Sequence, residues 1–343
     1  NQNGRIPILE YHLIGDKDGT YSREVEHFKR DLQLLYDRGY RPITVAQLMD
    51  KKFDIPVGTS PVVFTFDDAS PGQFRYIEKN GQLEIDPNSA VGIWLDFNKK
   101  HPDWKNRATF CLLPAAKAGH AFFGEKGIEG QKSEWRFKKV KFLADQGFEL
   151  CNHTLWHAQL SKYPDAFVQE QIARGVMAID SAVPGYKVRT MALPQGLWPK
   201  NRPLAWQGSW TDKKSGREIR YAHDGVLEVA GPAAPSPFTS GFNTHSLPRV
   251  QVIGNVIEKT LDRLEATHER FARILGRIVL RRVGPRQERA RLDVDQRRGH
   301  HEELARDVEV QFLNERHRLE VLLRDERDRN VVDVDFVLLD QMQ

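Results

Sequence analysis

The chain has 343 residues, a length that suits one large domain or two domains of average size. Hydrophobic residues make up 40% of it and charged residues 29%, as in ordinary globular proteins. No run approaches the roughly 18 consecutive apolar residues of a membrane-spanning helix, and the net charge of +4 is too small to indicate a nucleic-acid partner. Two cysteines are too few for a disulfide framework.

Strand-like and helix-like patterns alternate along the first 260 residues. A short apolar strand ends at Tyr11 and His12, and a run of β-branched and aromatic residues ends at Asp67. Further strands are predicted over 107–114, 148–153, 187–196 and 224–231, and helices over 22–40, 133–147 and 164–183. Residues 43–52 are expected to form a strand end and a second short helix. Residues 70–106 are expected to form a helix with surface loops. This alternation predicts an α/β fold with a mainly parallel sheet that is closed or nearly closed.

The composition changes near residue 265. Residues 266–343 contain no lysine and many arginines, whose charge is balanced by acidic residues. We therefore predict a catalytic domain over 1–265 and a separate C-terminal segment over 266–343. That segment is either a helical appendage or a non-native sequence, read from a wrong frame or fused. Neither interpretation makes it part of a catalytic site.

Polar residues follow several predicted strands. Asp67 and Asp68 end one strand, His153 and His157 follow another, and Pro194 follows a third. In parallel α/β folds the chemistry lies at the carboxyl ends of the strands. Two imidazoles four residues apart can share a metal with one carboxylate and leave a coordination position open. The second acid can then act as general base, because adjacent residues of a strand point in different directions.

Simpler explanations exist for each pair. Adjacent aspartates at a strand end are common in turns and helix caps, and two histidines at this spacing are often exposed or structural. Both pairs, however, follow strands of the same β-α pattern. That shared context favours one common site.

The stretches TFDD at 65–68 and NHTLWHAQL at 152–160 resemble two motifs of a known family. The family is that of the polysaccharide deacetylases, carbohydrate esterase family four, also called the NodB-homology domain. Its motifs read roughly TFDD and H-[ST]-x-x-H with a leucine three residues on, and Leu160 matches. The resemblance covers about residues 5–262. It implies an irregular (β/α) barrel and a metal-dependent hydrolase that removes N-acetyl groups from an amino-sugar polymer by attack of a metal-bound water.

The resemblance also implies roles for the motif residues. Asp67 would be the general base. Asp68, His153 and His157 would bind one divalent metal, most often zinc, although the same ligands also suit cobalt or nickel. The metal and one backbone N–H would hold the oxyanion of the tetrahedral intermediate.

Two positions depart from the family pattern. The motif R-x-P-[YF]-G corresponds to MALPQG, in which Pro194 precedes Gln195, and the N–H of Gln195 is expected to bind the oxyanion. The motif arginine, which orients the base, is replaced by Ala192. The L-x-H motif of the general acid has no clean match. We prefer His245, which follows the last predicted strand, over His223.

The substrate is predicted to be an N-acetylated glycan. Trp156 and Trp198 are expected to stack on sugar rings, with Arg249 and His12 at the edge of the site, although tryptophans can also simply close the barrel. Two alternatives remain for the function: an impaired glycan-binding protein that keeps the metal, or an amidase acting on a non-sugar C–N bond. The resemblance implies a secreted, periplasmic or cell-envelope protein.

Overall fold

The computed structural model describes residues 1–115 and 121–273 and four later strands, β15 (Ile278–Leu280), β16 (Leu292–Val294), β17 (Glu309–Val310) and β18 (Val321–Leu322). Asn1–Arg273 form one compact unit and Ile274–Gln343 a second. In the second unit β15 pairs with β16, and β17 with β18, both antiparallel. The boundary at residue 265 and the nature of 266–343 stay predictions, since most of that segment lies outside the described residues.

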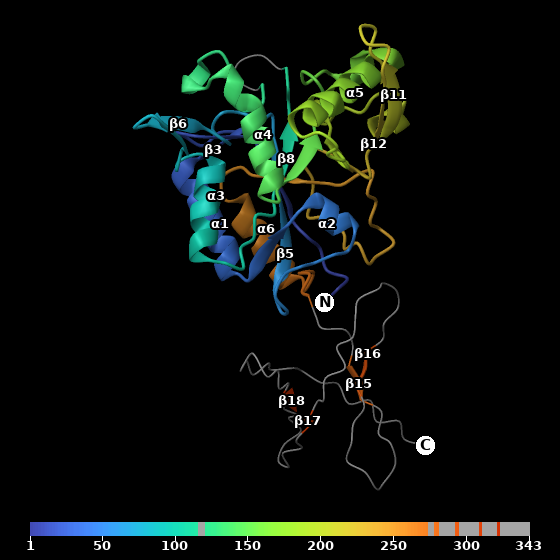
Figure 1. Cartoon of the computed structure of the whole chain (residues 1–343). Helices are drawn as coiled ribbons and strands as arrows, with labels where there is room; N and C mark the ends of the chain where they lie inside the picture. Colours follow the sequence, from blue (N-terminus) through green and yellow to red (C-terminus); the bar gives the residue numbers. More distant parts are fainter. Residues whose placement is uncertain (116–120, 274–277, 281–291, 295–308, 311–320, 323–343) are drawn as a thin grey trace. The chain divides into compact units, whose positions relative to one another are not determined.

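A parallel eight-stranded sheet forms the centre of the first unit (Figure 1). Its order is β13-β10-β9-β8-β5-β1-β14, and β4 pairs with the first half of β5. The strands are β1 (Ile8–Tyr11), β4 (Tyr40–Ile43), β5 (Ser60–Asp67), β8 (Thr109–Leu112), β9 (Glu149–Asn152), β10 (Thr190–Ala192), β13 (Gly225–Leu227) and β14 (Val250–Gln251). The longest strand, β5, is buried along its whole length, as its continuous apolar run predicts.

The segment 244–252 closes the sheet. Leu247 pairs with Leu227 at the end of β13, and β14 pairs with β1 at the other edge. The N–H of Val252 also donates to the carbonyl of Glu10 at 3.1 Å. One segment therefore bonds to both edges of the sheet, and the predicted α/β barrel of parallel strands is confirmed.

Side chains of the sheet alternate between the barrel interior and the surrounding helices. On β5, Val63 packs inside, and Phe64 and Phe66 pack outside. The outer face is covered by α1 (Val25–Asp37), α3 (Ala90–Lys100), α4 (Arg136–Asp145), α5 (Asp165–Ala182) and α6 (Val256–Ala266) (Figure 1). Inward-facing positions near the strand ends are thus the ones that can reach a common site.

The short helix α2 (Val45–Met49) lies at the amino end of the barrel. The N–H of Ala46 donates to Oε2 of Glu149 at 2.9 Å, and the N–H of Val45 to Oγ1 of Thr109 at 3.2 Å. Glu149 and Thr109 are the first residues of β9 and β8. The carboxyl end, where the predicted motifs lie, is the opposite end.

Smaller elements surround the barrel. β2 (Leu13–Gly15) pairs with β3 (Ser22–Glu24), β6 (Tyr76–Lys79) with β7 (Gln82–Ile85), and β11 (Gln207–Thr211) with β12 (Glu218–Ala222), the last pair lying against α5 (Figure 1). The helix predicted over 22–40 begins only at Val25, because the residues before it pair as β3. No helix in the described part of the chain is long and apolar enough to span a membrane.

Candidate active site

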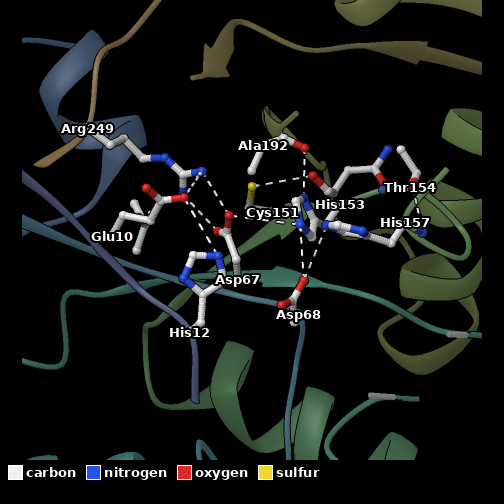
Figure 2. Close-up of polar contacts among 12 residues, drawn as sticks. Glu10, His12, Asp67, Asp68, Cys151, His153, Thr154, His157, Ala192 and Arg249 are labelled. Carbon is white, nitrogen blue, oxygen red and sulfur yellow. Dashed lines mark hydrogen bonds and ion pairs between the residues drawn. The ribbon is translucent and has the colours of Figure 1, made fainter. Parts of the chain in front are cut away.

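Asp67 ends the central strand, Asp68 follows it, and their side chains diverge (Figure 2). Asp67 continues the inward alternation of Val63 and is buried. Asp68 has a φ of +77°, so the chain leaves the strand here and its carboxylate turns toward two histidines. Such backbone costs about 1–3 kcal/mol and persists where tertiary contacts hold it. The predicted divergence of the two acids is confirmed.

Arg249 lies beside Asp67 inside the barrel (Figure 2). Its Nη1 and Nη2 donate to the two carboxylate oxygens of Asp67, each at 2.8 Å. Nη2 also lies 2.9 Å from Oε1 of Glu10, and Nε donates to the carbonyl of Glu228 at 2.6 Å. Burial alone would raise the pKa of Asp67, but Arg249 and, less, His153 hold that pKa well below its usual range. Asp67 is therefore ionised at neutral pH.

This placement corrects two expectations. Arg249 was predicted to bind substrate at the edge of the site, but its side chain is fully buried and its donors are bonded inside the barrel. Arg249 contacts Asp67 in the way that the family's motif arginine, replaced here by Ala192, was expected to do. Ala192 is an interior residue of β10, and the guanidinium comes instead from the segment just before β14.

Asp68, His153 and His157 form a cluster at the carboxyl end of the barrel (Figure 2). Oδ1 of Asp68 lies 3.3 Å from Nε2 of His153 and 3.6 Å from Nε2 of His157. Two ligands of one tetrahedral zinc ion, each about 2.0–2.1 Å from it, are about 3.3 Å apart. The three side chains therefore fit a zinc-sized cation with little movement. The structure brings together the three predicted ligands.

His153 is oriented by the neighbouring strand. Its Nδ1 lies 2.8 Å from the carbonyl oxygen of Ala192, to which it donates. The lone pair of Nε2 then faces the cluster, as in histidines that bind metals. Burial lowers the pKa of His153, but the carboxylates of Asp67 and Asp68 outweigh it and raise the pKa. A divalent cation and a proton would compete for the same atom.

His157 lies in the irregular loop after β9. Both Thr154 and His157 have a φ of +67°, and the N–H of His157 donates to Oγ1 of Thr154 at 3.1 Å. Burial and the neighbouring His153 lower the pKa of His157 to about 4. The imidazole is therefore neutral at pH 7, which is the form that binds a metal.

His12 approaches Asp67 from the side away from the other two histidines (Figure 2). Ligand-type atoms of Glu10, His12 and Asp67 all lie within 4.8 Å of one another. Nε2 of His12 is 3.8 Å from Oε1 of Glu10, and its ring packs edge-on against Tyr21 with centroids 5.1 Å apart. The His12 side chain is 13% exposed, and its binding of substrate at the edge of the site stays a prediction.

Pro194 begins a single turn of 3-10 helix, Pro194–Gly196, directly after β10. Gln195 has a φ of +56°, and its Oε1 accepts a hydrogen bond from Nε2 of Gln159 at 2.9 Å. That bond ties the turn to the loop that carries His157. The turn therefore lies beside the cluster, and the oxyanion role of Gln195 stays a prediction.

His245 lies elsewhere, which contradicts its predicted role as general acid. Its ring stacks on Trp206 with centroids 4.5 Å apart and 9° between the planes. It lines a cavity of about 460 Å³ together with Met49, Arg189 and Asp224. These residues end α2 or precede β10 and β13, so the cavity belongs to the amino end of the strands.

His223, the other candidate acid, is buried just before β13, with a side chain that contacts Asn152 and the Ala205 carbonyl. The order of the residues along the chain could not show whether His223, His245 or His12 lies at the carboxyl end of the strands. Glu10 was missed altogether, although an acid two residues before His12 in an apolar strand shares its face.

Two tryptophans lie close to the motif residues along the chain. Trp156 is 46% exposed and lies against Phe167, which in turn packs on Tyr163. Trp198 is half-buried, and the guanidinium of Arg202 covers its ring at 3.9 Å. Trp156 thus offers a free surface near the second histidine. Sugar binding by either tryptophan stays a prediction.

Comparisons with known proteins agree with this geometry. Residues 92–206 match the family model described as polysaccharide deacetylase. A chitooligosaccharide deacetylase of Bradyrhizobium sp. (strain ANU 289) is 32% identical over 62 residues, which cover 18% of this chain and only 28% of that relative.

Two solved structures share the fold. A polysaccharide deacetylase from Bacillus cereus superposes with a TM-score of 0.52 at 18% identity, covering 76% of this chain and 69% of the other. A deacetylase from Streptococcus pyogenes, solved in complex with acetate, gives a TM-score of 0.52 at 16% identity, covering 76% and 98%. At such low identity these likenesses establish the barrel alone.

Proposed function

We propose that the chain is a polysaccharide deacetylase, a hydrolase that removes N-acetyl groups from an amino-sugar polymer with one bound divalent metal ion, and the match of residues 92–206 to the family model supports this. One observation carries the proposal. A carboxylate that Arg249 keeps ionised, Asp67, lies directly beside the cluster of Asp68, His153 and His157. Zinc is the first choice for the ion, and cobalt and nickel suit the same ligands.

Asp67 and Arg249 provide the general base and its orientation in the proposed reaction. When bound to the cluster, the ion would act as a Lewis acid that polarises the amide carbonyl and a water molecule. Asp67 accepts the proton that the attacking water releases, since it is ionised and its Oδ2 lies 3.8 Å from Nε2 of His153. Arg249 fixes both oxygens of that carboxylate in place, so the base is oriented before substrate binds.

The leaving amine and the oxyanion need two further donors. The N–H of Gln195, in the turn beside the cluster, donates to the oxyanion. His12 takes the place of His245 as the donor of a proton to the leaving nitrogen. It lies beside Asp67, and its Nε2 is 3.8 Å from Oε1 of Glu10.

The two alternatives are less well supported. An impaired glycan-binding protein was suggested by the missing motif arginine and the missing acid. The contact of Arg249 with Asp67 and the position of His12 beside Asp67 support the hydrolase instead. An amidase for a non-sugar C–N bond would use the same residues. The exposed Trp156 beside the cluster favours a sugar ring over a non-sugar substrate.

Acetate release tests the proposal. The substrates are N-acetylglucosamine oligomers and peptidoglycan, each assayed with zinc, with chelator, with Asp67→Asn and with the control Asp224→Asn at the amino end of the strands. We expect release that chelator and Asp67→Asn abolish and that Asp224→Asn leaves intact. Release that survives Asp67→Asn would remove the base assignment. No release from protein that holds one metal tightly would favour the binding protein.

A further inference from the structure

The loop that carries His157 has an unusual backbone. Thr154 and His157 both have a φ of +67°, a value that residues other than glycine seldom adopt. Such a conformation persists only where surrounding contacts determine it. The direction of the second histidine therefore depends on the groups that hold this loop.

Asn152 provides one of those groups. It is the last residue of β9, and its buried side chain points away from the barrel interior, toward α5. Its Oδ1 accepts a hydrogen bond from the N–H of Thr154 at 2.9 Å. Oγ1 of Thr154 in turn accepts from the N–H of His157 at 3.1 Å. A chain of two hydrogen bonds thus leads from Asn152 to His157.

The amide of Asn152 is itself fixed on two sides. Its Nδ2 donates to the carbonyl of Ile172 in α5 at 3.0 Å and lies 3.5 Å from Nε2 of His223. The helix approaches so closely at Gly175 that an added Cβ would lie 2.2 Å from Oδ1 of Asn152. The amide cannot flip here without setting donor against donor and acceptor against acceptor.

His223 is held in the matching tautomer. Its Nδ1 donates to the carbonyl of Ala205 at 3.0 Å, which leaves Nε2 as an acceptor for Nδ2 of Asn152. Burial lowers the pKa of His223 to about 4, so the neutral ring persists at pH 7. A residue before β13 therefore helps to fix a loop that follows β9.

We propose that Asn152 and His223 are positioning residues of the metal site: their buried contact fixes the loop that directs His157 toward the ion. The inference rests on the proposed function, because it takes His157 as a metal ligand. Partners of this kind, one step behind the ligands, commonly change metal affinity by about 10–100-fold when they are replaced.

Two substitutions of His223 separate positioning from packing. In His223→Gln, the side-chain oxygen can occupy the place of Nε2 and accept from Asn152. In His223→Asn, the shorter amide can replace only Nδ1 and bond to Ala205. We expect His223→Asn to weaken Co²⁺ binding by about 10–100-fold and to change the visible spectrum of the cobalt protein, and His223→Gln to stay within about threefold of wild type. Thermal unfolding of the metal-free proteins should change equally in both.

Asn152→Asp provides the second test. The carboxylate keeps the acceptor for Thr154 but loses the donor toward Ile172 and His223, so we expect a similar loss of Co²⁺ affinity. His245→Asn, which leaves this contact untouched, should bind Co²⁺ like wild type.

Three outcomes would overturn the inference. Wild-type affinity in both His223→Asn and Asn152→Asp would do so, as would equal losses in the two His223 variants. In both cases the proposed function would stand. Failure of the wild-type protein to bind Co²⁺ would overturn the proposed function as well.

Discussion

Two buried carboxylates lie at opposite ends of the barrel, and their partners differ. At the carboxyl end, Arg249 donates to both oxygens of Asp67 at 2.8 Å. At the amino end, Glu149 accepts from the hydroxyls of Thr109 and Thr190 at 2.9 Å each. Burial raises the pKa of Glu149, whereas Arg249 overcomes burial and lowers the pKa of Asp67.

The comparison shows that burial alone does not make an acid reactive. Glu149 accepts hydrogen bonds from neutral donors, which do not offset the effect of burial on its pKa. Its role is structural, because its carboxylate joins α2 to the strands. A guanidinium keeps Asp67 ionised in the same kind of environment, so it can accept a proton. The partner of each buried carboxylate therefore decides the direction in which its pKa is shifted.

Replacing Arg249 with methionine would remove the difference between the two carboxylates and should have the largest combined effect on stability and activity. Glu10 and Asp67 would remain as buried carboxylates without their cation, which costs about 3–5 kcal/mol of unfolding free energy. Misplacement of the base should lower acetate release by at least about 10²-fold. Urea unfolding and acetate assays measure the two effects. Arg249→Lys, which keeps the charge but not the paired contact, should recover stability more than activity; full activity of Arg249→Met would contradict the assignment.

His12→Ala and His245→Ala compare histidines at the two ends. Loss of the proton donor should lower acetate release about 10²–10⁴-fold in His12→Ala. His245→Ala, at the amino end, should stay within about twofold of wild type. Steady-state assays over pH 5–9 make the comparison. The opposite ranking of the two variants would restore His245 as the acid.

Lys139 is a second buried ionisable group with neutral hydrogen-bond partners, and it tests whether burial shifts its pKa as it shifts that of Glu149. Its Nζ donates to the carbonyl of Phe123 and to Oε1 of Gln131, both at 2.7 Å, and burial lowers its pKa to about 7. Between this value and the ordinary lysine pKa of about 10.4 the unfolded chain binds more protons, so stability should rise with pH.

Urea unfolding of wild type and Lys139→Met at pH 7 and 9 measures this effect. The difference in unfolding free energy should move in favour of wild type by about 1 kcal/mol per pH unit. Lys139→Arg, which stays charged, serves as the control and should show no such gain. A constant difference across this range would mean that the folded and unfolded pKa values are alike.

Glu149→Gln should have the smallest effect on catalysis. One acceptor oxygen becomes a donor, which should lower the unfolding free energy by about 1–3 kcal/mol. Because the folded pKa is raised, the wild type should lose stability relative to the variant as pH rises above the ordinary glutamate value. Acetate release per folded molecule should not change. A loss of activity without a loss of stability would give Glu149 a catalytic role.

Short-range patterns determined the elements and the ligand cluster. The apolar run before Asp67 predicts a buried strand, and the spacing of His153 and His157 places both imidazoles after one strand. These features depend on neighbours within a few residues, where backbone geometry leaves few alternatives. Most strands of the barrel, most of the helices and the grouping of Asp68 with both histidines could therefore be predicted from the sequence, whereas the short paired strands around the barrel could not.

Only the tertiary structure decided which distant residues complete the site. Arg249 meets Asp67 across 182 residues of sequence, because the closing segment runs along the barrel from the amino toward the carboxyl end. Four residues of extended chain span about 13 Å. That length separates His245, left at the amino end, from Arg249, which reaches the base. The sequence itself determined the motifs, the pairing of β1 with β5 placed His12 beside Asp67, and the closure of the sheet brought Arg249 to Asp67.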